Sequence, residues 1–281
     1  MNKRCARVFF GPASIGLMAM ACCGSSEAPT AATGAAPAAS TAAEFVRSGK
    51  EKLAKGDRVA AIADFTQAIG LDAKNTEALT QRALAKIFSV DIKGAIADYD
   101  RALEIDPGNA ALYDDRGFMG GYNFDYDRAI ADFDRAIAIN PRLASAFLHR
   151  GQAEWSKRAM EKAMADLTRA IELDPKLDQA YFYRGNVKSD TGDRAGAIAD
   201  YTRALELAPN DLRTLKSRAV EREVSGDPQG AIADFTRAIE ISPHPWIEYY
   251  DRGRAKERMG DKAGAEADYK RADEIKAIKG G

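Results

Sequence analysis

Residues 94–99 read Gly-Ala-Ile-Ala-Asp-Tyr, and three closely similar hexapeptides begin at residues 128, 196 and 230. The starting positions are separated by 34 or 68 residues, so the chain repeats itself with a period of 34 residues. A period of this length indicates supersecondary units that stack on one another. Continuing the step in both directions through the 281-residue chain gives seven units without a gap: 42–75, 76–109, 110–143, 144–177, 178–211, 212–245 and 246–279.

The pattern inside each unit predicts two helices joined by a turn. In the second helix, Ala95, Tyr99 and Ala102 share one helical face, and Pro107 ends the helix. In the first helix, a large residue is followed four positions later by Gly or Ala, which we expect to lie opposite the alanine columns of the second helix. The turn is supplied by Gly-Asp pairs at residues 56–57, 192–193, 226–227 and 260–261, because glycine permits unusual backbone angles and aspartate caps a helix.

A 34-residue helix–turn–helix with this spacing of large residue, Gly, Ala, aromatic residue, Ala and Pro resembles the tetratricopeptide repeat (TPR). The resemblance covers residues 42–279 and implies an all-α fold, a right-handed α-solenoid of seven antiparallel helix pairs. It also implies that the first helices line a concave groove that holds an extended or helical segment of a partner protein. Co-chaperone TPR domains clamp a C-terminal carboxylate with a Lys, Asn and Arg set, of which only Asn186 and Lys216 are present, so we do not expect that specificity.

Two columns of charged residues depart from the general TPR pattern. Arginine precedes the Gly or Ala position in six units, where the family usually has leucine, and aspartate stands in the second helix of all seven. A bidentate contact between arginine and carboxylate in each repeat explains both columns, and an anion-binding ladder of arginines is the alternative. The residues are Arg82, Arg116, Arg150, Arg184, Arg218 and Arg252, with Ser48 in the first unit, and Asp64, Asp98, Asp132, Asp166, Asp200, Asp234 and Asp268.

A third column of the first helix also departs from the family, which usually has an aromatic residue there. We expect the packing at this column to differ from that of other TPR proteins. The residues are Lys52, Lys86, Gly120, Glu154, Lys188, Arg222 and Lys256.

The candidate groove is the face of the first helices that varies most from unit to unit. Three variable columns are spaced i, i+4 and i+7, and therefore lie on one helical face. The middle of this face is aromatic and apolar, and buried aromatic side chains carry much of the binding energy of interfaces. Packing of these side chains against neighbouring repeats is the alternative. The candidates are Leu84, Ile87, Phe88, Phe118, Tyr122, Leu148, Gln152, Trp155, Phe182, Asn186 and Lys216.

The N-terminal segment has the features of an export signal. In residues 1–21, three basic residues precede a short apolar run that ends in an A-x-A cleavage site. Cys22 follows, and this arrangement resembles the lipobox of bacterial lipoproteins, although Ala19 stands where that family prefers leucine. The resemblance implies that Cys22 carries a lipid. Residues 22–41 are rich in Ala, Ser, Thr and Pro, which predicts a tether.

The composition excludes several classes of protein. Lys and Arg number 41 and Asp and Glu 42, which gives a net charge of −1, so we expect no nucleic-acid partner. The three cysteines lie at residues 5, 22 and 23, which excludes a disulfide scaffold and an iron–sulfur protein. The mature region contains two histidines and no phosphate loop, GxSxG, HExxH or CxxC motif. We therefore expect no catalytic residue, no metal and no cofactor.

These features predict an exported TPR scaffold that is not an enzyme. We expect it in the bacterial cell envelope, facing the periplasm, anchored through the lipid on Cys22 and binding a protein or peptide partner in its groove. Membrane contact is expected only through the N-terminal lipid or signal. Cleavage without lipidation would give a soluble periplasmic or secreted protein. A structural or homo-oligomerising spacer and an enzyme built on a solenoid are the alternative functions.

Overall fold

The computed structural model describes residues 41–278, and every regular element in that range is an α-helix. The expected signal peptide and Cys22 lie outside the described residues. The described helices are α1 (Ala42–Ala54), α2 (Arg58–Leu71), α3 (Thr76–Phe88), α4 (Ile92–Ile105), α5 (Ala110–Tyr122), α6 (Tyr126–Ile139), α7 (Ala144–Ser156), α8 (Met160–Leu173), α9 (Asp178–Asp190), α10 (Arg194–Leu207), α11 (Leu212–Val224), α12 (Pro228–Ile241), α13 (Trp246–Arg258) and α14 (Lys262–Ile278).

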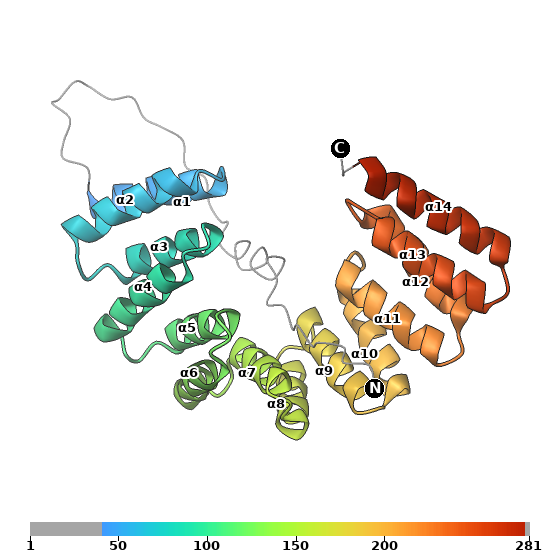
Figure 1. The fold of residues 1–281 in the computed structure, drawn as a ribbon. Helices are drawn as coiled ribbons and strands as arrows, with labels where there is room; N and C mark the ends of the chain where they lie inside the picture. The colour runs from blue at the N-terminus through green and yellow to red at the C-terminus, as the bar shows by residue number, and fades with distance from the viewer. Residues whose placement is uncertain (1–40, 279–281) are drawn as a thin grey trace. The chain divides into compact units, whose positions relative to one another are not determined.

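The chain divides into two compact units after Pro141. The first unit contains α1 to α6 and the second contains α7 to α14. Within each unit, every odd-numbered helix packs against the helix that follows it, and that second helix packs against the next odd-numbered helix (Figure 1). The predicted all-α stacking of consecutive helix pairs is thereby confirmed.

Small residues let the two helices of a pair approach closely. A Cβ atom added to Gly185 on α9 would lie 2.6 Å from the ring of Tyr201 on α10, and one added to Gly117 on α5 would lie 2.7 Å from the ring of Phe133 on α6. The atoms nearest to the glycine column are therefore those of the aromatic column of the second helix. The sequence pattern placed the alanine column opposite the glycines. Backbone atoms of that column are the next nearest: a Cβ atom on Gly117 would lie 3.1 Å from the Ala129 carbonyl oxygen.

The turn inside each pair needs one residue with a left-handed backbone. In three consecutive repeats this residue is not glycine. It is Val90, Phe124 or Arg158, with φ values of 63° to 64°. Left-handed backbone is unfavourable for a residue with a Cβ atom, and most of all for a β-branched one. Val90 and Phe124 are also exposed to solvent. Glycine takes the position in the other repeats that have a described turn: Gly56, Gly192, Gly226 and Gly260.

The arginine and aspartate columns meet in the interior of each pair. Between α9 and α10, the Nε and Nη2 atoms of Arg184 each lie 2.8 Å from a carboxylate oxygen of Asp200. Five further pairs make the same bidentate contact: Arg82–Asp98, Arg116–Asp132, Arg150–Asp166, Arg218–Asp234 and Arg252–Asp268. In the first pair, where Ser48 replaces the arginine, Lys52 Nζ lies 2.6 Å from Asp64. The guanidinium groups thus bind carboxylates of the protein itself.

The remaining Nη1 atom of the arginine reaches the preceding repeat. Arg218 on α11 donates through Nη1 to Thr202 Oγ1 on α10 at 3.1 Å. Arg116 on α5 donates in the same way to Asp100 on α4 at 2.7 Å. One guanidinium therefore joins three helices, two from its own repeat and one from the repeat before. The spacing of the columns did not reveal this second contact.

The large residue of the first helix supports the arginine. The Arg184 Cζ atom lies 5.7 Å from the centre of the Tyr181 ring, and Arg252 Cζ lies 5.3 Å from that of Tyr249. These separations fall within the range of favourable cation–π contacts. The aromatic ring, three residues before the arginine on the same helix, holds the guanidinium in the direction of its aspartate.

The column where other TPR proteins have an aromatic residue supplies a second cation. Lys188 Nζ lies 2.8 Å from Asp200, and Arg222 Nη1 lies 2.8 Å from Asp234. The effect on a carboxyl group is clear at Asp268. Burial alone would raise its pKa, but hydrogen bonds from Arg252 and Lys256 outweigh burial and lower the pKa below the usual value. The packing at this column differs from that of other TPR proteins, as expected, because a lysine or arginine there contacts the buried aspartate.

Glu154 on α7 breaks this pattern, because it places an acid where most repeats place the second cation. Its side chain is buried, and its Oε2 atom accepts no hydrogen bond within the described part of the chain. Burial and, after it, the charge of Asp166 raise the pKa of Glu154 from 4.5 to about 7. Arg150 and Lys162 act in the opposite direction but do not cancel the rise.

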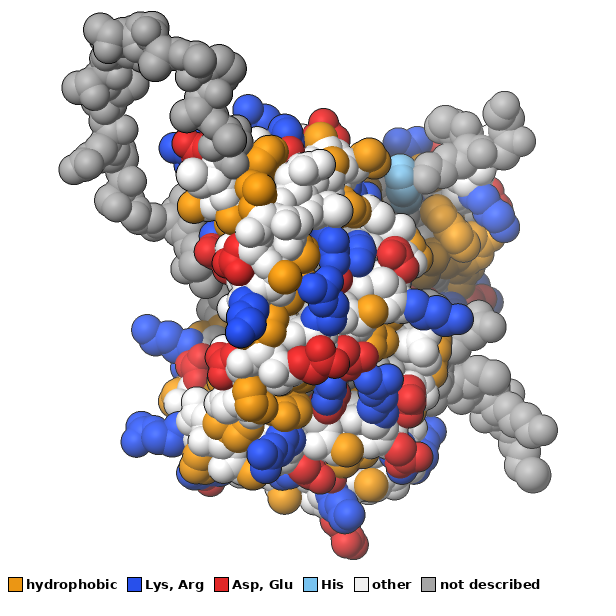
Figure 2. Space-filling model, turned by 90° about the vertical axis from the view of Figure 1, so that its left-hand side faces the viewer, with side chains coloured by type: hydrophobic (Ala, Val, Ile, Leu, Met, Phe, Trp, Pro, Cys, Tyr) orange, Lys and Arg blue, Asp and Glu red, His pale blue; other side chains and the backbone are white. Residues whose placement is uncertain are grey.

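The outer surface carries charges of both signs. On the face that Figure 2 shows, Lys and Arg side chains lie among Asp and Glu side chains, in keeping with the net charge of −1. Between residues 41 and 278, no helix combines the length and the apolar character that crossing a bilayer requires.

We expect Glu154→Gln to stabilise the protein most at high pH. The folded-state pKa of about 7 lies above the ordinary value of 4.5, so the folded protein holds an extra proton between these values. Wild-type stability should therefore fall as pH rises through this window and stay reduced above it. At about pH 8 the amide should raise the free energy of unfolding by roughly 1–3 kcal/mol, and at about pH 4.5 the gain should be small.

Urea denaturation of the two proteins at a series of pH values measures this difference. Glu206→Gln is the matched control, because Glu206 is an exposed acid that pairs with Arg203 on the surface of α10. A difference between Glu154→Gln and wild type that stays constant from about pH 5 to pH 8 would contradict the assignment.

Candidate functional site

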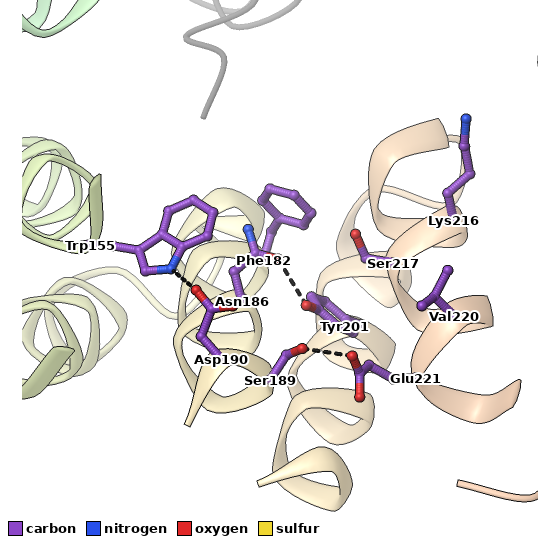
Figure 3. A pocket seen from close by; sticks show the side chains of 10 residues that line it. All are labelled: Trp155, Phe182, Asn186, Ser189, Asp190, Tyr201, Lys216, Ser217, Val220 and Glu221. Atoms are coloured by element: carbon purple, nitrogen blue, oxygen red, sulfur yellow. Dashed lines mark hydrogen bonds between the residues drawn. The ribbon is translucent and has the colours of Figure 1, made fainter. Parts of the chain in front are cut away.

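The candidate site is a pocket of about 380 Å³ in the second unit. It opens on the face formed by the odd-numbered helices α7, α9 and α11, and α10 contributes one side chain. Its lining residues are Trp155 from α7, Phe182, Asn186, Ser189 and Asp190 from α9, Tyr201 from α10, and Lys216, Ser217, Val220 and Glu221 from α11 (Figure 3).

Helical periodicity places these side chains together. Phe182, Asn186 and Asp190 follow one another at intervals of four residues, so they form a stripe along α9. On α11, Lys216 and Val220 have the same spacing. The pocket is the space between these two stripes, and the larger part of its surface is apolar.

Three hydrogen bonds join lining side chains of different helices. Trp155 Nε1 donates to Asp190 Oδ2 at 2.8 Å, which ties α7 to α9. The Tyr201 hydroxyl donates to Asn186 Oδ1 at 2.8 Å. Ser189 Oγ donates to Glu221 Oε1 at 2.6 Å, which ties α9 to α11 (Figure 3). The polar groups of the pocket are therefore held in place before any ligand arrives.

Acidic groups dominate the electrostatics around Tyr201. Burial raises the pKa of its hydroxyl, and the charges of Glu221, Asp190 and Asp200 raise it further. The hydroxyl is thus a proton donor at physiological pH. The one cation among the lining residues is Lys216, whose Nζ atom lies 3.0 Å from Glu248 on α13.

Four of the groove residues expected from the sequence meet in this pocket: Trp155, Phe182, Asn186 and Lys216. Phe182 is 8% exposed, and its ring centre lies 5.1 Å from that of Tyr183 and 6.1 Å from that of Tyr201. It forms part of the wall rather than an exposed anchor.

Four other expected groove residues are buried, namely Ile87, Phe118, Leu148 and Gln152. Ile87 and Phe118 belong to the hydrophobic core of the first unit. Gln152 is 2% exposed and donates to the buried Tyr183 hydroxyl at 2.8 Å. None of the four lines the pocket, although Trp155, Phe182, Asn186 and Lys216 occupy equivalent positions of other repeats.

The last three expected groove residues lie in the first unit, apart from the pocket. Phe88 and Tyr122 are partly buried and pack against the core there, with the Arg58 guanidinium 5.7 Å from the Phe88 ring centre. Leu84 lines another hollow, of about 450 Å³, together with Thr80 and Leu112. The arginine and aspartate columns do not line the pocket that contains Trp155 and Phe182, whereas Arg218 and Asp234 line a separate hollow of about 350 Å³ in the same unit.

The sequence pattern gave no reason to select Asp190, Tyr201, Ser217 or Glu221 as site residues. Tyr201 belongs to the aromatic column of the second helices, which the repeat assigns to the core. Asp190 follows Asn186 by four residues, so extending that column by one turn could have found it. Within residues 41–278, no cluster of His, Cys, Asp and Glu side chains has the arrangement of a metal site.

Comparisons with known proteins agree with this architecture. Profiles of the tetratricopeptide repeat match residues 122–178, 178–211 and 249–278. No curated protein matches the sequence.

Three solved structures illustrate the similarity of fold. The Cut9–Hcn1 hetero-tetramer of the APC/C aligns with a TM-score of 0.69 at 18% identity, over 76% of this chain and 43% of that one. The chain thus spans less than half of the length of that relative. PilW, a type IV pilus biogenesis factor, aligns with a TM-score of 0.65 at 20% identity, over 71% of this chain and 92% of that one. A tetratricopeptide repeat protein from Parabacteroides merdae aligns with a TM-score of 0.63 at 20% identity, over 83% and 93%.

At these identities the similarity concerns the fold alone. The profile matches and the tandem helix pairs of 34-residue period show that the chain is a tetratricopeptide repeat protein.

Proposed function

We propose that the protein is a scaffold that binds a segment of a partner protein in the pocket formed by α7, α9, α10 and α11. The observation that carries the proposal is the meeting of Trp155, Phe182 and Tyr201 in one hollow on the face of the odd-numbered helices. Aromatic side chains next to fixed hydrogen-bonding groups are typical of sites where interface energy is concentrated.

The preformed network supports binding of a polypeptide segment. The hydrogen bonds of Trp155, Tyr201 and Ser189 hold the pocket in one arrangement, which reduces the entropy lost on binding. TPR proteins generally act as scaffolds for protein partners rather than as enzymes, and the Cut9–Hcn1 structure is itself a hetero-tetramer.

We further propose export and lipid anchoring at Cys22, on the sequence of residues 1–22 alone. A basic stub, a short apolar run and a small residue before cysteine support this assignment. In this proposal the scaffold faces the periplasm on a bacterial membrane, and residues 23–41 connect it to the lipid.

Photo-crosslinking tests the pocket. We expect a benzoylphenylalanine that replaces Val220, which lines the pocket, to cross-link the partner in living cells. The same residue in place of Val59 is the control, because Val59 is 80% exposed and lies in the first unit. Trp155→Ala should abolish the cross-link at position 220, since it removes one aromatic wall, whereas Trp246→Ala should preserve it.

A partner that cross-links equally at positions 220 and 59 would contradict the proposed site. So would a cross-link at position 220 that Trp155→Ala leaves unchanged, provided that thermal denaturation shows both variants to be folded.

Metabolic labelling with a radioactive fatty acid tests the anchor. We expect wild type and Cys23→Ala to be labelled and Cys22→Ala to be unlabelled, because the first cysteine after Ala21 is the proposed acceptor. Unlabelled wild-type protein, or labelled Cys22→Ala, would overturn the assignment.

A further inference from the structure

We propose that the pocket recognises a lysine or arginine side chain of the bound segment, with the carboxylate of Glu221 as its acceptor. This inference rests on the proposed function and specifies the chemistry of the partner. Four features of the pocket carry it: one unsatisfied carboxylate oxygen, a second acid at the rim, aromatic walls, and a lysine whose charge is already paired.

Glu221 has an acceptor that the fold does not use. Its Oε1 atom accepts a hydrogen bond from Ser189, whereas its Oε2 atom is buried and accepts none within the described residues. Arg194 Nε lies 3.6 Å from Oε2, which is an ion-pair separation but too long for a hydrogen bond. A buried carboxylate oxygen without a donor is unfavourable. Because Oε2 is covered, a ligand reaches it once the Glu221 side chain turns within the pocket that it lines, and a guanidinium or ammonium group is then the strongest donor for it.

Asp190 adds a second acid at the rim. It accepts hydrogen bonds from Trp155 Nε1 and Arg158 Nη1, each at 2.8 Å, and both end on Oδ2. The other oxygen keeps acceptor capacity. The Arg158 side chain is 57% exposed, so this surface ion pair adds little energy and can rearrange when another cation arrives.

The aromatic walls are suited to the same ligand. A cation beside an aromatic ring is attracted by the negative face of the ring, most strongly when water is excluded. Trp155, Phe182 and Tyr201 surround the pocket, and Arg213 Cζ already lies 5.2 Å from the centre of the Phe182 ring. The methylene groups of a lysine or arginine also match a lining that is largely apolar.

Lys216 does not oppose this assignment. Its ammonium group pairs with Glu248 on α13, whose side chain is 4% exposed, and it extends away from Glu221 (Figure 3). Arg158 and Arg194, the cations beside Asp190 and Glu221, are both more than half exposed and neutralise these acids less than buried partners would, so an acidic ligand would meet like charges. Charge complementarity therefore favours a basic side chain over a carboxylate.

Selection from a random decapeptide library displayed on phage tests the inference on the purified full chain. We expect the selected peptides to contain a lysine or arginine beside apolar residues. In fluorescence anisotropy, replacing that lysine by norleucine, or that arginine by citrulline, should weaken binding to wild type about tenfold.

The acceptor is identified by repeating the measurement on Glu221→Gln, which keeps the shape of the side chain. The same peptide substitution should then weaken binding by only about threefold or less, because the main acceptor is gone while Asp190 and the aromatic walls remain. Glu206→Gln is the matched control and should behave as wild type, since Glu206 does not line the pocket. Equal melting temperatures verify that the variants are folded.

The outcomes separate this inference from the proposed function. Selected peptides that bind wild type and Glu221→Gln equally, or that lack basic residues, would overturn the recognition of a cation. If Trp155→Ala still abolished their binding, the pocket would remain a peptide site. If no peptide were selected, or if Trp155→Ala left binding unchanged, the proposed function and the inference would both be wrong.

Discussion

A buried aspartate on each second helix is the constraint on which the repeat depends. A carboxylate inside a protein is unfavourable unless donors surround it. Here an arginine from the preceding first helix supplies two parallel hydrogen bonds, as Arg184 does for Asp200. In several repeats a lysine or arginine one turn later adds a third. The aspartate therefore specifies which helix packs against it and in which register.

The same arginine also connects successive repeats. Its Nη1 atom reaches a threonine or an aspartate on the second helix of the repeat before, as in Arg218 to Thr202. Buried ion pairs often add little net stability, but they disfavour arrangements that leave a charge without its partner. This contact therefore fixes the order and spacing of neighbouring pairs within a unit. Side chains on the remaining face of the odd-numbered helices can then vary, and in the second unit that variation produces the pocket.

Periodicity predicted the fold well because every element of it recurs. The alanine positions recur at 34 residues throughout, the prolines after most second helices and the turn glycine in four of the seven repeats follow the same period, and stacked helix pairs follow from them. The arginine and aspartate columns also pointed to each other, since each arginine has one carboxylate at a constant spacing. The contact to the preceding repeat was not predictable from spacing alone, because it depends on how far one pair is displaced from the next.

The candidate site was predicted less well for a physical reason. Ile87 and Trp155 occupy the same position of the repeat, and so do Gln152 and Asn186, yet the first of each pair is buried and the second lines the pocket. The difference comes from the side chains of the next repeat, such as Tyr183, whose hydroxyl accepts a hydrogen bond from Gln152. Glu221 was not predicted as a site residue because a single acid on a helix rich in charged residues does not stand out in the sequence. Only the structure shows that one of its oxygens is buried without a donor.

A double-mutant cycle on Arg184 and Asp200 tests the central role of the buried ion pair most directly. The free energy of unfolding would be measured for wild type, Arg184→Ala, Asp200→Ala and the double variant. Each single change should cost about 3–5 kcal/mol, because it leaves a buried charge without its partner. The double change should cost much less than the sum, with a coupling energy of at least about 2 kcal/mol. Single changes that each cost under about 0.5 kcal/mol and add independently would contradict the account.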